Sequence, residues 1–150
     1  PSVNDLAEFN IFNKVAKAEW DTLLFFFGVI FCVGGLGTIG YLGAVSQVMY
    51  EGWGATNANI VAGLLSAVVD NIPVMFAILS MNPEMETYQW LLVTLTAGVG
   101  GSLLSVGSAA GVALMGQSQG KYTFFSHMKW TWAVALGYAA SIYTHYLING

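Results

Sequence analysis

The sequence predicts an all-α membrane protein with about three transmembrane helices, one of them broken, and a re-entrant helical hairpin. Of its 150 residues, 56% are hydrophobic and 8% are charged, against roughly 25% charged residues in soluble domains. The mean hydropathy is +0.65. Because a folded chain of this size leaves about a third of its surface exposed, most of that surface is expected to face lipid.

Composition also excludes several function classes. Lysine and arginine together number four and the net charge is −4, so the chain lacks the basic surface that nucleic acids require. The single cysteine, Cys32, allows neither an internal disulfide nor a zinc set. No nucleophile motif or phosphate-binding loop is present, and we expect no enzyme activity. The chain starts at Pro1 with an acidic stretch instead of a signal peptide, so we expect a fragment.

Two segments open the chain. Residues 6–20 place apolar side chains along one stripe at helical spacing, which predicts an interfacial helix lying on the membrane. Residues 22–49 contain no charge and are long enough to cross a hydrocarbon core of about 30 Å. The run is rich in glycine, which we interpret as close packing between helices. These glycines are Gly34, Gly35, Gly37, Gly40 and Gly43.

The next apolar segment, residues 57–82, is interrupted at its centre by Asp70, Asn71 and Pro73. Proline lacks a backbone N–H and disfavours helix at the preceding residue, so the helix is expected to end near Asp70 and restart near Pro73. Each arm would be about 15–20 Å long, which reaches the middle of a bilayer without crossing it. Both a broken spanning helix and a re-entrant hairpin fit these lengths.

The distribution of lysines favours the hairpin. Lys14 and Lys17 precede the first span, and Lys121 and Lys129 precede the last. Lysines collect in cytoplasmic loops, whereas acidic residues carry little information about orientation. A segment that enters and returns keeps both lysine pairs on the cytoplasmic side, whereas a full crossing would separate them. The loops between the pairs carry only acidic residues, which are Glu51, Glu84 and Glu86.

Two further spans complete the chain. Residues 88–116 predict a broken span, because Gly100, Gly101 and Gly107 loosen the helix at its centre; non-helical backbone at membrane depth occurs only where it is buried in protein or lines a cavity. Residues 130–148 predict an uninterrupted final span. His127 lies in the preceding cytoplasmic loop, where we expect a solvated or headgroup-facing side chain.

An ionisable residue at membrane depth is a functional-site hypothesis, so Asp70 is the leading candidate. Its carboxylate can hold either a proton or a small hard cation. Na⁺ requires oxygen ligands, which Asn71, Ser102 and the carbonyls of the second break supply; Ser105 and Ser108 are further candidates. Structural alternatives remain open: Asp70 hydrogen-bonded or paired within the bundle, Asn71 as a helix cap, and the serines as helix contacts.

Three stretches together resemble a known family. SAVVDNIPVMFAILSMNP, then GGSLLSVGSAAGVALMG and KYTFFSHMKWTWAVALGYAASIYTHYLI, are similar to the C-terminal half of NhaD-type sodium/proton antiporters, in the superfamily that includes arsenite and dicarboxylate carriers. The resemblance implies two inverted repeats, each with a hairpin and a broken helix, of which this chain is the second. Asp70 and Asn71 match the hairpin tip, and the three serines match the unwound stretch. Related anion carriers have Ser-Asn-Thr at this tip, so Asp-Asn favours a cation.

The expected function is therefore secondary transport that exchanges Na⁺ or Li⁺ for H⁺ across an inner membrane, with multiple crossings and no cofactor beyond the transported ions. The expected partners are membrane lipid and the first repeat of the same transporter. If no first repeat is present, a second copy of the chain is expected in its place. Two alternatives remain: a carrier for arsenite or dicarboxylates, and a non-transporting membrane subunit in which Asp70 is a pairing group.

Overall fold

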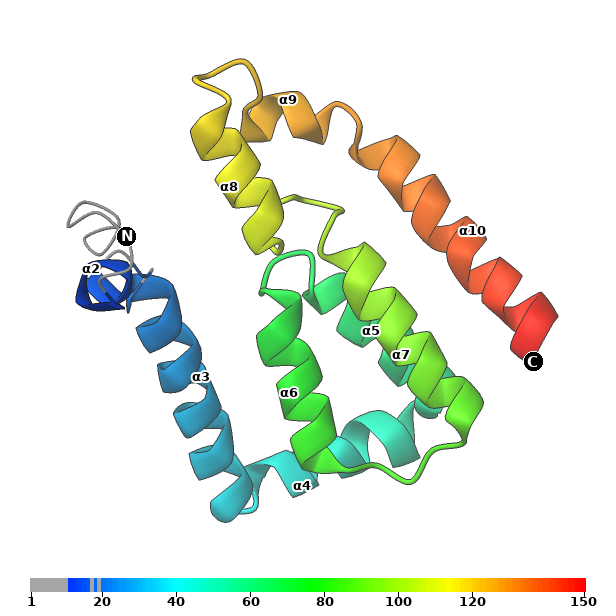
Figure 1. The fold of residues 1–150 in the computed structure, drawn as a ribbon. Helices are drawn as coiled ribbons and strands as arrows, with labels where there is room; N and C mark the ends of the chain where they lie inside the picture. Colours follow the sequence, from blue (N-terminus) through cyan, green and yellow to red (C-terminus); the bar gives the residue numbers. More distant parts are fainter. Residues whose placement is uncertain (1–10, 17, 19) are drawn as a thin grey trace, which may run out of the picture.

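The computed structural model describes residues 11–16, 18 and 20–150, and the prediction of an all-α chain is confirmed for them, because their regular elements are all helical (Figure 1). Residues 6–10, 17 and 19 of the predicted interfacial helix lie outside the described residues. In chain order the helices are α2 Ile11–Ala16, α3 Trp20–Thr38, α4 Tyr41–Ser46, the π-helix η1 Gln47–Gly52, α5 Ala55–Leu65, α6 Asn71–Met81, α7 Thr87–Gly100, α8 Ala109–Gln117, α9 Phe124–Met128 and α10 Thr131–Asn149.

The segment predicted as one span, residues 22–49, is bent in the structure. The axes of Leu23–Thr38 and Tyr41–Gly52 meet at 82°. The bend lies at Gly40, whose φ of +81° is a left-handed conformation that glycine adopts at little cost. Among the described helices none is by itself long and apolar enough to cross a membrane, but these two are when taken together.

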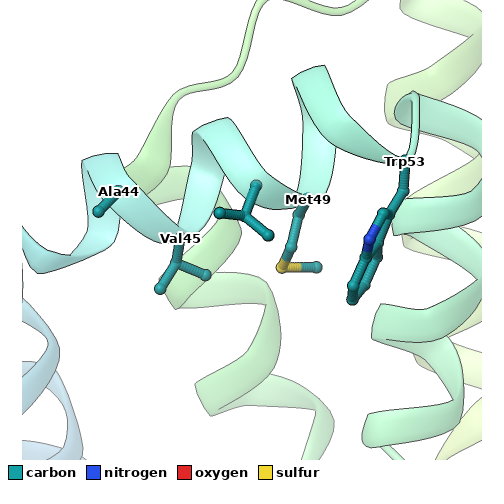
Figure 2. A pocket seen from close by; sticks show the side chains of 5 residues that line it. Ala44, Val45, Met49 and Trp53 are labelled. Atoms are coloured by element: carbon teal, nitrogen blue, oxygen red, sulfur yellow. The ribbon is translucent and has the colours of Figure 1, made fainter.

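Of the five glycines named for this run, only Gly37 lies in contact range of another described helix, because an added β-carbon would meet Leu42 Cδ1 of α4 at 3.6 Å. Added β-carbons at Gly34, Gly35, Gly40 and Gly43 would meet nothing within 4 Å. Along α4 and η1, Figure 2 shows apolar side chains pointing to one side of the ribbon, where they line a groove of about 370 Å³. The groove is lined by Ala44, Val45, Val48, Met49 and Trp53.

Helices α5 and α6 form a helical hairpin. Asp70 is the N-cap of α6, and Pro73 lies in its first turn, where a missing N–H leaves no hydrogen bond unmade. The helix therefore restarts at Asn71, two residues before the proline. At the opposite end of the hairpin, η1 and the chain that follows α6 line one cavity of about 420 Å³. Its lining residues are Ser46, Tyr50, Glu51, Asn82, Pro83 and Glu84.

Helix α7 packs along α5, and α10 packs on α7 (Figure 1). The α5–α7 interface consists mainly of small or polar residues, a composition that lets two backbones approach closely. Beyond Gly100 the chain leaves the helix and starts again as α8 at Ala109. Besides the bend at Gly40, two breaks therefore interrupt the helices of the described chain where the hairpin turns and where α7 gives way to α8, at residues 66–70 and 101–108. The buried interface residues are Ala58, Asn59, Ala62 and Gly63 of α5, and Leu92, Val93, Thr96, Ala97 and Gly100 of α7.

Candidate functional site

The two helix breaks are in direct contact. A β-carbon added at Gly107 would overlap the carbonyl oxygen of Ser66, and it would lie 2.8 Å from the carbonyl carbon of Ala67. A β-carbon at Gly101 would lie 2.8 Å from the Gly107 carbonyl oxygen. A side chain at Gly107 would push the hairpin turn away from the second break, and a side chain at Gly101 would press on the Gly107 carbonyl within that break. The glycines predicted to loosen the second helix therefore also let the turn of the hairpin reach it.

One helical turn below this contact, α5 and α7 touch at their backbones. A β-carbon at Gly100 would overlap the Gly63 carbonyl oxygen and lie 2.6 Å from its carbonyl carbon. On the other side of the contact, a β-carbon at Gly63 would lie 2.6 Å from the Thr96 carbonyl oxygen. Close approach of this kind requires glycine on both helices. The position of the second break relative to the hairpin is thereby fixed.

Hydrogen bonds between α5 and α7 reinforce this contact. The hydroxyl of Ser66, which is fully buried, donates to the Ala97 carbonyl at 2.8 Å, and the hydroxyl of Thr96 donates to the Asn59 carbonyl at 2.8 Å. The sequence alone did not indicate Ser66 or Thr96, because a single hydroxyl residue in an apolar helix belongs to no recognisable motif. Their roles depend on partners 31 and 37 residues away along the chain.

Asp70 lies between the two arms of the hairpin, half-buried and with an extended backbone (ψ 141°). Although it occupies the N-cap position, its carboxylate does not cap α6, and within the described part of the chain it makes no hydrogen bond or ion pair. Asn71 is the first residue of α6. It lines a shallow groove of about 300 Å³ with Ile72, Met75, Phe76 and Leu79.

The three predicted serines occupy different positions around the second break. Ser102 is exposed, and its carbonyl is bonded by a distant side chain. Ser105 is 4% exposed and has a φ of +61°, a left-handed conformation that is unusual for serine. Ser108 is the N-cap of α8, where its Oγ accepts a hydrogen bond from the Gly111 N–H at 3.3 Å.

Side chains from the C-terminal part of the chain hold the second break. The His127 Nε2 lies 2.8 Å from the Ser102 carbonyl oxygen, and the Thr131 hydroxyl donates to the Leu103 carbonyl at 3.0 Å. His127 is therefore half-buried against the break, which differs from the solvated position expected for a polar loop residue. The contact joins residues 25 apart in sequence, and no local pattern indicates it.

The structure thus joins the hairpin turn to the second break through Ser66, Ala67, Gly101 and Gly107. It places Asp70 in the same turn, three residues after Ala67. For the part of the chain that is described, no hydrogen bond links Asp70 to the predicted serines, and no three His, Cys, Asp or Glu side chains cluster as a metal centre would. The site instead consists of one carboxylate, that of Asp70, in a non-helical turn that contacts the second helix break.

Comparison with known proteins identifies related chains. The family model described as citrate transporter (CitMHS) matches residues 13–98. The Na⁺/H⁺ antiporter NhaD of Alkalimonas amylolytica is 64% identical over 141 residues, which is 94% of this chain and 29% of that protein. The Na⁺/H⁺ antiporter NhaD of Vibrio cholerae is 63% identical over 147 residues, which is 98% of this chain and 31% of that protein.

A more distant relative is sodium/proton antiporter 1 of Arabidopsis thaliana, which is 32% identical over 143 residues, covering 90% of this chain and 24% of that protein. No solved structure matches the chain. The chain spans 29% and 31% of the length of the two bacterial relatives. All three relatives carry the same transport activity in their names.

Proposed function

Because the chain belongs to the citrate transporter (CitMHS) family, we propose that it forms part of a multi-pass inner-membrane transporter that exchanges Na⁺, or Li⁺, for H⁺. Support for this choice of ions comes from the bacterial relatives, which are named Na⁺/H⁺ antiporters and are 64% and 63% identical to the chain. The resemblance of the hairpin tip to NhaD-type sequences, stated above from the sequence alone, favours the same ions.

The proposal rests on the environment of the Asp70 carboxylate. The carboxylate is half-buried in a helix break, and no hydrogen bond or ion pair within the described residues neutralises it. A carboxylate in such a place is expensive at membrane depth unless it binds a proton or a cation. The hairpin turn that carries it touches a second stretch of unwound backbone, and backbone of this kind supplies carbonyl ligands in secondary transporters.

The proposed mechanism uses Asp70 for both ions. With Na⁺ bound, the Asp70 carboxylate is the anionic ligand, and Asn71, Ser102 and carbonyls of the second break supply neutral oxygens. Ser105 and Ser108 border the same stretch. With H⁺ bound, the protonated carboxyl group leaves no anionic ligand for Na⁺. Rigid-body motion of the helices that carry the hairpin then changes the side of the membrane to which the site opens.

The hairpin is proposed to be re-entrant, with its tip near the middle of the bilayer. Its arms α5 and α6 have 11 residues each, about 16 Å at 1.5 Å per residue, which is half of a hydrocarbon core of about 30 Å. The other half of the ion site is proposed to come from the first repeat of the transporter or from a second copy of this chain. Membrane lipid is the proposed contact of the exposed apolar side chains on α3.

The test uses the full-length protein in everted membrane vesicles, in which Na⁺, Li⁺ or K⁺ is added to a pre-formed pH gradient. We expect Na⁺ or Li⁺ to collapse the gradient in the unmodified protein and in Glu84→Gln, which removes an exposed carboxylate far along the hairpin from its tip. Asp70→Asn should abolish the collapse at equal membrane content. Undiminished exchange by Asp70→Asn would refute the assignment of the site.

A second candidate function is carboxylate-anion transport, which the family description favours because it names citrate. In that case helix N-termini and hydroxyls would bind the anion, and Asp70 would bind only a coupling ion. Citrate, a dicarboxylate or arsenite added to the same vesicles distinguishes the two functions. A response to these anions with none to Na⁺ alone establishes the carrier, whereas assembly defects without any flux indicate a non-transporting subunit.

A further inference from the structure

The imidazole of His127 is bonded at both nitrogens. Its Nε2 lies 2.8 Å from the Ser102 carbonyl oxygen, and its Nδ1 is hydrogen-bonded to the Tyr122 hydroxyl. A carbonyl oxygen can only accept, so Nε2 carries the proton in this contact. In the neutral ring Nδ1 is then the acceptor, and the Tyr122 hydroxyl donates to it. These partners specify one tautomer of the neutral ring.

The surrounding chain holds this ring in place. Ser118 Oγ accepts a hydrogen bond from the Tyr122 N–H at 3.1 Å, which fixes the loop before α9. Thr123 caps α9, its Oγ1 accepting from the Ser126 N–H at 3.3 Å. The Tyr122 ring also meets the His127 ring edge-on, with 6.0 Å between centroids. Contacts within residues 118–127 therefore orient the His127 ring independently of its contact with the second break.

The target of the ring is the peptide group of Ser102. The neighbouring carbonyl, that of Leu103, accepts from the Thr131 hydroxyl at 3.0 Å. Two consecutive carbonyls of unwound backbone are thus held by α9 and α10. Because the orientation of a peptide group sets the direction of the neighbouring Cα–Cβ bond, these bonds fix the direction in which the Ser102 side chain leaves the backbone.

We propose that His127 is a positioning residue of the ion site: by donating from Nε2 to the Ser102 carbonyl it holds the unwound stretch in the arrangement that binds Na⁺. The inference rests on the proposed function, since Ser102 is a proposed ligand. His127 does not itself contact the ion. Its loss should weaken ion binding while the transport machinery remains assembled.

The chain contains a matched control. His145 Nε2 lies 3.1 Å from the Tyr88 carbonyl, and its Nδ1 accepts from the Asn149 side-chain amide at 3.1 Å. The same chemistry therefore occurs near the opposite end of α7, about 20 Å from Ser102 at 1.5 Å per residue. His145 is also buried, at 8% exposed. Changing it tests the general effect of losing a histidine-to-carbonyl bond.

The experiment measures the Na⁺ concentration for half-maximal exchange and the maximal rate, using the full-length protein in everted vesicles. Glutamine places an amide nitrogen near the position of Nε2, whereas asparagine places it near Nδ1. His127→Gln should therefore retain the half-maximal concentration, and His127→Asn should raise it roughly three- to tenfold, as expected for one hydrogen bond, with the maximal rate unchanged. His145→Asn, which removes the Nε2 donor to the Tyr88 carbonyl, should leave the half-maximal concentration unchanged.

An unchanged half-maximal concentration in His127→Asn overturns the inference while leaving the proposed function intact. If the maximal rate of that variant falls at the same time, the role of His127 is purely structural.

A readout independent of transport separates the inference from the proposed function. In ¹⁵N-histidine-labelled protein, NMR should report the Nε2-protonated neutral tautomer for His127, and NaCl but not choline chloride should shift its ring resonance. An Nδ1-protonated neutral ring, or a ring insensitive to Na⁺, contradicts the inference. Absence of Na⁺ exchange in the unmodified protein contradicts the proposed function instead, and the NaCl titration then decides the inference by itself.

Discussion

Gly100 is the residue at which the last turn of α7 meets the backbone of α5. A β-carbon there would overlap the Gly63 carbonyl oxygen, which belongs to rigid helical backbone and cannot rotate away. Forcing atoms into a packed contact typically costs about 1–3 kcal/mol. The close approach therefore requires glycine at position 100, although alanine is the better helix former in an isolated helix.

We predict that Gly100→Ala lowers the melting temperature of the purified protein in detergent, by an amount corresponding to about 1–3 kcal/mol. Gly98→Ala is the control on the same helix, because a β-carbon at Gly98 meets nothing within 4 Å. That variant should be neutral or slightly more stable, since alanine is the better helix former. Equal melting temperatures for the two variants would contradict the contact.

Residues differ in how far the sequence alone predicts their roles. Asp70 stands out because it is charged in an apolar segment, and the structure leaves its carboxylate without a partner among the described residues. Its role as an ion ligand remains a prediction. Ser66 and His127 act through contacts 31 and 25 residues away, and no local spacing encodes such contacts. Their importance becomes visible only once the chain is folded.

At the scale of elements, the pairing of α5 with α7 rests on buried polar groups as well as on glycine. Asn59 is fully buried, and its amide donates to the Gln89 side chain at 2.9 Å and to the Gln89 carbonyl at 3.0 Å. The Tyr138 hydroxyl of α10 donates to the Ile60 carbonyl at 2.9 Å. Polar groups in a membrane protein stabilise helix contacts when all of them are bonded.

Replacing Thr96 by valine tests this pairing. The change keeps the shape of the side chain but removes the hydroxyl that donates to the Asn59 carbonyl at 2.8 Å, so we expect a loss of about 1 kcal/mol of stability. Thr94→Val is the matched control, because the exposed Thr94 hydroxyl bonds only within its own helix, to the Trp90 carbonyl. Thermal unfolding in detergent measures both, and equal effects would argue against the pairing.

The contact between the two breaks yields a prediction about transport. Gly107→Ala should cut Na⁺-dependent exchange at least tenfold, because its β-carbon would overlap the Ser66 carbonyl and displace the hairpin turn. Gly116→Ala on α8 introduces the same methyl group where nothing lies within 4 Å, and its exchange should equal that of the unmodified protein. Vesicle assays at matched protein content provide the comparison. Normal exchange by Gly107→Ala would exclude a functional role for the contact.

Elements were predicted best where the sequence contains a strong interruption. The hairpin follows from Asp70, Asn71 and Pro73, and the second break follows from the glycines between Gly98 and Gly107. The bend at Gly40 was not predicted, because residues 22–49 contain six glycines that look alike in sequence. Only Gly40 among them has a positive φ, and the choice depends on how α4 packs against α6.

At the scale of the whole molecule, the described chain contains one helical hairpin and one broken helix, and it spans 29% and 31% of the length of the two bacterial relatives. The large apolar side chains of α3 are exposed in the described chain, among them Phe25, Phe27 and Phe31. In the proposed assembly they face lipid or the first repeat. In the same proposal, the first repeat or a second copy of the chain supplies the other half of the ion site.

The central claim is that Asp70 exchanges a proton for Na⁺, and proton release on ion binding tests it most directly. NaCl is added to purified full-length protein in weakly buffered detergent solution, with choline chloride as the salt control, and the pH change is followed. Unmodified protein should release up to about one proton per site in a saturable manner, and Asp70→Asn should release none. Equal release by both proteins, or no release by the unmodified protein, would contradict the claim.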